Sequence, residues 1–182
     1  MPAETSLPAD IVLRNYFHAK DENRPRLLSR TFTPDVLLEV RNRTSTITFP
    51  SVIRGREAIA DVLVRSFGQK YENVYSFYLQ RPAGTLPAFE CQWNVAMTEK
   101  ESRRVRLGCG NYAWLFDAHP PNLACRLTID IAEMQVLSPS EASETFAAVD
   151  MLTYPWSSLA EVARVAARHP VFNRIAQALG SP

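Results

Sequence analysis

Cysteine is scarce in this sequence, with three residues in 182. Cys91, Cys109 and Cys125 are odd in number and widely spaced. That excludes a closed disulfide framework and the paired spacing of a zinc site. Each cysteine lies in an apolar stretch typical of a strand, so we expect small buried side chains.

Long apolar runs are also missing: no stretch approaches the roughly 18 residues of a membrane-spanning helix. Residues 1–6 include an acid and lack the apolar core of a signal peptide. The formal net charge is +1 and the arginines are scattered among acids, so nothing indicates a nucleic acid or an anionic membrane as a partner. The sequence therefore predicts a reduced, cytoplasmic protein.

Familiar catalytic motifs are absent too. His18, His119 and His169 lack the spacing of metal ligands, and no Ser-His-Asp or Cys-His signature is visible. Gly108 and Gly110 lie inside an expected strand with no helix after it, which indicates a bend in a sheet and not a phosphate loop. The sequence predicts no metal and no cofactor.

The apolar residues follow helical spacing in some segments of the chain and strand alternation in others, in a clear order. The length of 182 residues and the 46% of hydrophobic residues are ordinary for one globular domain. Residues 55–67 predict an amphipathic helix with an apolar face at helical spacing. That face consists of Ile59, Val62, Leu63, Ser66 and Phe67.

Two helices and one strand are expected before this helix. Ser6 caps the first, which presents Val12 and Tyr16 on one face. A short second helix covers residues 23–32, and residues 36–41 are rich in strand formers.

Four strands are expected after the helix, over residues 74–80, 89–98, 105–116 and 125–137. The expected order of elements is helix, helix, strand, helix and then four strands. This order predicts an α+β cone. In such a cone the helices pack into the mouth of a strongly curved antiparallel sheet.

Pairing apolar side chains with apolar side chains predicts the register of the last strands, because a slip of one residue would mix the two faces. The predicted pairs are Trp93–Cys109, Val95–Leu107, Met97–Val105, Cys91–Asn111, Leu115–Leu127, Ala113–Ile129, Asn111–Ile131 and Cys109–Glu133. Asn111 and Glu133 then lie on an otherwise apolar inner face, where a polar group needs a partner or a wet cavity. The other interpretation places Asn111 at a bulge and Glu133 at the rim of the sheet.

The same alternation turns three aromatic side chains, Tyr112, Trp114 and Phe116, to the outer face of the sheet. Gln92 and Asn94 lie beside them on the neighbouring strand. Large aromatic rings among modest polar groups suit an interface better than open solvent. We therefore expect a homodimer through this face.

The C-terminal region is predicted to be helical. A capping box at residues 138–141 begins one helix, Ser158 caps another, and Pro170 begins the last. No linker of flexible composition precedes it. We expect residues 138–182 to be an extension packed on the domain of residues 1–137.

Three stretches together resemble the nuclear transport factor two-like family, which includes ketosteroid isomerase and polyketide cyclases of the SnoaL type. They are residues 13–17 (LRNYF), 28–36 (LSRTFTPDV) and 53–59 (IRGREAI). The resemblance extends over roughly residues 8–137 and implies a cone-shaped sheet closed by helices over a pocket. Members are isomerases, dehydratases, cyclases, ligand binders or interaction modules, so the resemblance leaves the function open.

The resemblance to the isomerases can be carried over for some residues. Tyr16 matches a pocket tyrosine that donates a hydrogen bond to a substrate oxyanion. The basic aspartate of the isomerases has no match, because Val40 occupies its position and alternation turns Glu39 the other way. Near the second oxyanion donor, a protonated carboxylic acid, this sequence has Asn111 or Tyr112.

One class of function is a pocket that binds a small, largely apolar molecule through Tyr16, Trp93, Asn111 and Glu133. Acid/base chemistry of the isomerase, cyclase or dehydratase type would follow from it. Glu133, with its pKa raised by burial, is the candidate base, with Tyr16 as the hydrogen-bond donor. Glu39 is the fallback base if the first strand carries a bulge that reverses its direction.

The alternative class is a non-catalytic interaction or structural module. The lack of a matching acid–base pair and the presence of a helical tail favour it. In that case Phe172 or Trp156 would plug the pocket, and the sheet would mediate dimerisation.

Overall fold

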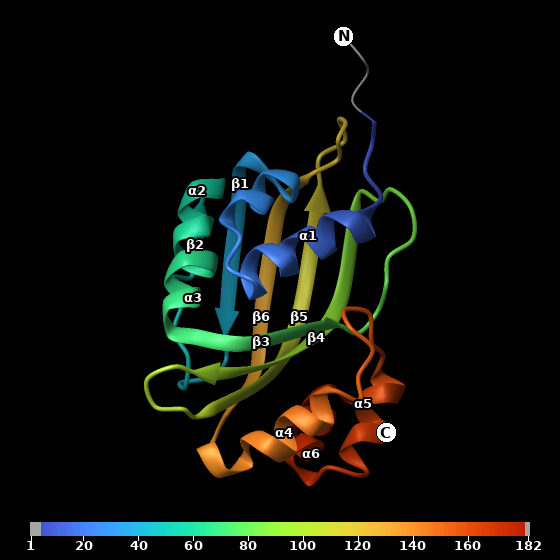
Figure 1. Cartoon of the computed structure of the whole chain (residues 1–182). Helices are drawn as coiled ribbons and strands as arrows, with labels where there is room; N and C mark the ends of the chain where they lie inside the picture. The colour runs from blue at the N-terminus through green and yellow to red at the C-terminus, as the bar shows by residue number, and fades with distance from the viewer. Residues whose placement is uncertain (1–4, 181–182) are drawn as a thin grey trace.

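The computed structural model describes residues 5–180 and is built around one open six-stranded sheet (Figure 1). The strands are β1 (Phe32–Asn42), β2 (Val52–Arg54), β3 (Tyr71–Tyr78), β4 (Ala88–Glu99), β5 (Val105–Phe116) and β6 (Ala124–Leu137). Their order in the sheet is β2-β1-β6-β5-β4-β3. All neighbours are antiparallel except β1 and β6, which are parallel. The predicted α+β cone with a strongly curved antiparallel sheet is confirmed, and the parallel pair of β1 and β6 is the exception to its antiparallel order.

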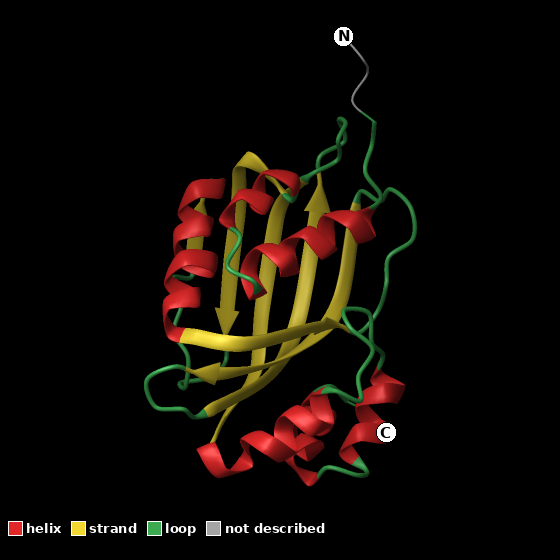
Figure 2. Cartoon of the chain, viewed as in Figure 1, coloured by secondary structure: helices red, strands yellow, loops and turns green. Residues whose placement is uncertain are grey.

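Helices cover the concave face of this sheet (Figure 2). They are α1 (Ala9–Asp21), the 3₁₀ helix η1 (Pro25–Arg30), and a long helix made of α2 (Arg56–Ile59), the π-helical η2 (Ala60–Ser66) and α3 (Phe67–Lys70). Among the described residues, no helix combines the length and apolarity needed to cross a membrane.

The first helix starts slightly later than predicted, with Pro8 and not Ser6 at its N-cap. Asp10 lies in its first turn, and His18 and Lys20 lie in its last, which suits the helix dipole. Its inner face is buried against the sheet, as the periodicity predicts.

The π-helical middle of the long helix changes which side chains are buried. The buried ones are Ile59, Ala60, Leu63, Val64 and Phe67. Val62 is half-buried and Ser66 exposed, contrary to the predicted face. A π turn spans i to i+5 in place of i to i+4, so the spacing of an α-helix does not select the inner positions here.

The predicted register between β4 and β5 is wrong by one residue. Trp93 lies opposite Gly110 and not Cys109, and Cys91 lies opposite Tyr112. The other predicted pairs shift likewise, apart from Cys109–Glu133, which a bulge after Cys109 preserves. Apolar side chains cover both faces of β5, because its outer face is also buried, so the apolar pattern cannot tell one face from the other.

As a consequence, the aromatic residues Tyr112, Trp114 and Phe116 lie on the inner face and are buried in the main core. Their predicted place on the outer face is wrong, and they cannot form the contact of a homodimer. The dimer itself stays a prediction.

The C-terminal extension packs on the outer face of the sheet (Figure 1). Its helices are η3 (Pro139–Glu141), α4 (Ala142–Val149), α5 (Leu159–Ala166), η4 (Pro170–Phe172) and α6 (Asn173–Ala178). The predicted capping box of Ser138 and Glu141 is present. Phe172 and Ile175 of the extension form a second apolar cluster with Leu107 of β5.

Candidate functional site

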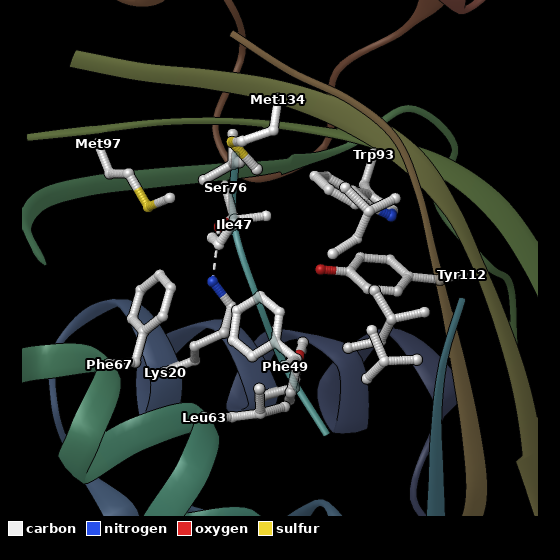
Figure 3. Close-up of a pocket in the computed structure, with 15 residues that line it drawn as sticks. Lys20, Ile47, Phe49, Leu63, Phe67, Ser76, Trp93, Met97, Tyr112 and Met134 are labelled. Carbon is white, nitrogen blue, oxygen red and sulfur yellow. Dashed lines mark hydrogen bonds between the residues drawn. The ribbon is translucent and has the colours of Figure 1, made fainter. Parts of the chain in front are cut away.

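A small cavity lies between the helices and the concave face of the sheet (Figure 3). Its walls come from α1, the long helix, the β1–β2 connection at residues 43–51 and inner side chains of the sheet. It has a volume of about 50 Å³, and most of its lining is aliphatic, aromatic or methionine. Its few polar groups belong to Tyr16, Lys20, Ser76, Trp93 and Tyr112.

Two buried tyrosines supply hydroxyl groups. Tyr16 of α1 and Tyr112 of β5 meet edge to face, with ring centroids 6.0 Å apart. The Tyr16 hydroxyl has no hydrogen-bond partner among the described residues, and the Tyr112 hydroxyl lies near it without regular hydrogen-bond geometry. Burial raises the pKa of both hydroxyls, so both are protonated donors at neutral pH.

A charged cluster lies at another part of the wall, where Lys20 and Ser76 line the cavity and Asp21 binds both of them. Lys20 Nζ donates to Asp21 Oδ1 at 2.5 Å. It also donates to Ser76 Oγ at 3.0 Å, the bond drawn dashed in Figure 3. Asp21 also accepts from the Ser76 backbone N–H and from its hydroxyl, each at 3.0 Å. The side chains of Lys20 and Asp21 are 8% and 2% exposed, so solvent screens this pair little.

Opposing effects act on the Asp21 carboxyl. Burial raises its pKa, while the charge of Lys20 and the hydrogen bonds from Lys20 and Ser76 lower it. Lys20 Nζ also lies 5.1 Å from the ring centre of Phe67 and 5.7 Å from that of Phe17. A cleft with a titratable group perturbed by burial and one specific partner is a candidate functional site.

The structure brings two of the predicted ligand-binding residues, Tyr16 and Trp93, into the cavity wall. Asn111 and Glu133 do not lie there, and their predicted place on the inner face is wrong. Glu133 faces outward, where both of its carboxylate oxygens accept from Arg174 of the extension at 3.0 Å. The shift of register explains this difference for Asn111.

The first strand follows its predicted alternation. Val40 lines the cavity, and Glu39 points to the other side, where its carboxylate lies 3.9 Å from Arg126. No bulge turns Glu39 inward, since β1 and β6 stay in register over this part.

Sequence reasoning did not find Lys20, Asp21 or Ser76. Lys20 does carry a signal, because it follows Tyr16 by four residues and so shares its face of α1. Asp21 and Ser76 carry none: they are 55 positions apart and meet only because β3 packs beside the end of α1.

Neither side chain expected to plug the pocket does so. Phe172 is buried on the outer side of the sheet. Trp156 stacks on Tyr78, with ring centroids 5.0 Å apart, and is not among the residues that line the cavity. The arrangement therefore does not favour the alternative of a plugged interaction module.

The mouth of the cavity adjoins a larger groove of about 560 Å³. Ile47, Phe49 and Phe67 line both spaces and so separate them. The connection that carries Ile47 and Phe49 is attached to β6 by a hydrogen bond from Thr46 Oγ1 to the Met134 carbonyl at 2.6 Å.

No protein-family model and no curated protein matches the sequence. Several solved structures do match. A nuclear transport factor 2 (NTF2-like) superfamily protein from Salmonella enterica serovar Typhimurium has a TM-score of 0.53 at 13% identity, covering 70% of this chain and 87% of that one. An NTF2-like protein of unknown function from Burkholderia pseudomallei has a TM-score of 0.54 at 10% identity, covering 69% and 92%.

A type 2 hexachlorocyclohexane dehydrochlorinase has a TM-score of 0.53 at 12% identity, covering 70% of this chain and 84% of that one. Identities this low establish the fold and nothing more. The chain has the nuclear transport factor two-like fold, as the sequence resemblance implies.

Proposed function

We propose that this protein of nuclear transport factor two-like fold binds a small, largely apolar molecule in its cavity. Acid/base chemistry of the isomerase, cyclase or dehydratase type on that molecule belongs to the proposal. The observation that carries it is the Tyr16 hydroxyl, which is buried at an apolar cavity and has no partner among the described residues. Leaving a buried donor unpaired costs about 1–3 kcal/mol, and an oxygen function on a ligand would remove that cost.

The chemistry is assigned to groups at the cavity wall. Tyr16 and Tyr112 are protonated donors, suited to stabilise negative charge that develops on a ligand oxygen. Lys20 is the proposed acid, and Asp21 is the proposed proton acceptor through the Ser76 hydroxyl.

The size of the cavity implies that its mouth must open. Pockets for drug-sized ligands have volumes of roughly 300–1,000 Å³, whereas this cavity has about 50 Å³. Phe49 separates it from the groove of about 560 Å³, so displacement of this ring would join the two spaces. Met97 and Met134 add flexible side chains to the wall.

Binding is tested with a panel of phenolic, steroidal and polyketide-like compounds in thermal unfolding. At least one compound is expected to raise the melting temperature of the wild type, since a ligand at 100 times its Kd adds about 2.7 kcal/mol. Tyr16→Phe should reduce the shift for compounds with an oxygen function, because it removes the donor and keeps the ring.

Two variants serve as matched controls. Asn111→Leu and Glu133→Gln alter polar side chains of the neighbouring strands outside the cavity, so every ligand shift should persist in them. The proposal fails if no compound stabilises the wild type, or if these two variants abolish the shifts and Tyr16→Phe does not.

A second prediction concerns the mouth. Phe49→Ala is expected to strengthen the binding of one-ring compounds by about tenfold, because the wild type must first displace this ring to become competent for binding. Phe89→Ala is the control, since Phe89 packs at the core without lining the cavity. Calorimetric titration measures both, and equal affinities in the two variants would contradict a gate at Phe49.

The homodimer and the cytoplasmic location remain proposals from the sequence. With Tyr112, Trp114 and Phe116 buried inside, a dimer would have to use other outer-face residues that the extension leaves uncovered. Light scattering at micromolar concentration would give the mass.

A further inference from the structure

The Lys20 ammonium has one more hydrogen to donate than its neighbours accept. An ammonium group carries three N–H donors. Asp21 and Ser76 accept two of them. Figure 3 shows Nζ among the side chains of the cavity wall, and no third acceptor is bonded to it among the described residues.

The charge at this place is already balanced. Lys20 is the only charged residue that lines the cavity in the part of the chain described, and the carboxylate of Asp21 is paired with it. A ligand carboxylate would bring an additional negative charge into a desolvated site that contains a complete ion pair, which is unfavourable. A pure hydrocarbon would leave the third N–H of Lys20 and the Tyr16 hydroxyl unpaired.

An uncharged carbonyl oxygen adds no charge to the site and still accepts the hydrogen bonds that a hydrocarbon would leave unmade. It has two lone pairs, so it can accept from Lys20 and from a tyrosine hydroxyl without changing the net charge. We infer that Lys20 is the polar anchor of the cavity and that it selects a small, largely apolar molecule presenting an uncharged carbonyl group. This inference rests on the proposed function and adds the chemical class of its ligand.

Besides the proton transfer proposed above, Asp21 and Ser76 hold the Lys20 ammonium in position. The backbone N–H of Ser76 in β3 holds one oxygen of Asp21, and the Ser76 hydroxyl and Lys20 hold the other. The rings of Phe17 and Phe67 lie against the ammonium as well. Lys20 is thereby kept at the wall before any ligand arrives, which lowers the cost of ordering on binding.

Three compounds of similar shape test the inference: acetophenone, ethylbenzene and benzoate. Calorimetric titration of the wild type and of Phe49→Ala measures their affinities. Acetophenone is expected to bind at least about tenfold more tightly than ethylbenzene in both proteins, since hydrogen bonds to charged groups are the strong ones. Benzoate is expected to bind most weakly.

The role of Lys20 is isolated by the double variant Lys20→Met/Asp21→Asn, which removes both charges and leaves no unpaired carboxylate. In it the preference for acetophenone over ethylbenzene should fall below about twofold. Lys70→Met, at one of the two other lysines, is the control and should retain the preference.

The outcomes separate the two proposals. If none of the three compounds binds either protein and the wider panel fails as well, the proposed function is wrong and the inference falls with it. If ethylbenzene binds as tightly as acetophenone, the cavity is a binding site and the inference is wrong. Tighter binding of benzoate, or a preference that survives in the double variant, also overturns it.

Discussion

Replacing Lys20 by methionine is expected to lower the free energy of unfolding by about 3–5 kcal/mol, as for other broken buried ion pairs. The substitution keeps an unbranched apolar chain against Phe17 and Phe67 and removes the charge. The Asp21 carboxylate, 2% exposed, then has no cation beside it. Chemical denaturation of the two proteins measures the difference.

The pH dependence distinguishes this cause from a packing defect. Burial already raises the pKa of Asp21, and losing Lys20 removes the main opposing effect, so the pKa rises further. Above its folded pKa the carboxyl is charged in both states, and the penalty is fully present. As the pH falls below that pKa the folded state takes up a proton before the unfolded one does, so the loss of stability becomes smaller.

The double variant Lys20→Met/Asp21→Asn provides the control. It leaves no buried charge, so much of the stability should return, as replacement of buried ion pairs in other proteins indicates. A loss in Lys20→Met that is independent of pH and equal in the double variant would contradict this account.

Gly110→Ala is expected to have an effect of similar or larger size, about 4 kcal/mol or more, which is exceptional for adding one methyl group. A Cβ at this position would lie 1.8 Å from the carbonyl oxygen of Asp130 and 2.9 Å from Cζ2 of Trp93. The first contact is with the backbone of β6, so β5 and β6 would have to separate at their bulge.

The control for Gly110→Ala is Gly84→Ala. Gly84 has a φ of +69°, and a Cβ added there would have no atom within 4 Å, so only the left-handed backbone costs energy, about 1–2 kcal/mol. Denaturation curves of both variants separate the clash from the general effect of a β-carbon. Losses of equal size would show that β5 and β6 accommodate a side chain at residue 110.

Local periodicity predicted the elements of this fold well. The helix after Pro8, the four later strands and the capped helices of the extension depend on spacing, turn residues and caps within a few positions of each other. The periodicity of the long helix failed only where its π-helical middle changes the spacing. The cavity residues Tyr16 and Trp93 were within reach of the same reasoning, because each lies on a clear apolar face.

What the sequence by itself determined is therefore the α+β class, the order of its elements apart from the short strand β2, and most of the side chains that are buried. Only the tertiary structure decided which neighbours bury them. Apolar residues cover both faces of β5, because the extension packs on the outer face of the sheet. A hydrophobic pattern therefore shows that a side chain is buried but not on which face of the sheet it lies. The cluster of Lys20, Asp21 and Ser76 depends on the same step, because contacts between α1 and β3 arise from packing and leave no pattern in the chain.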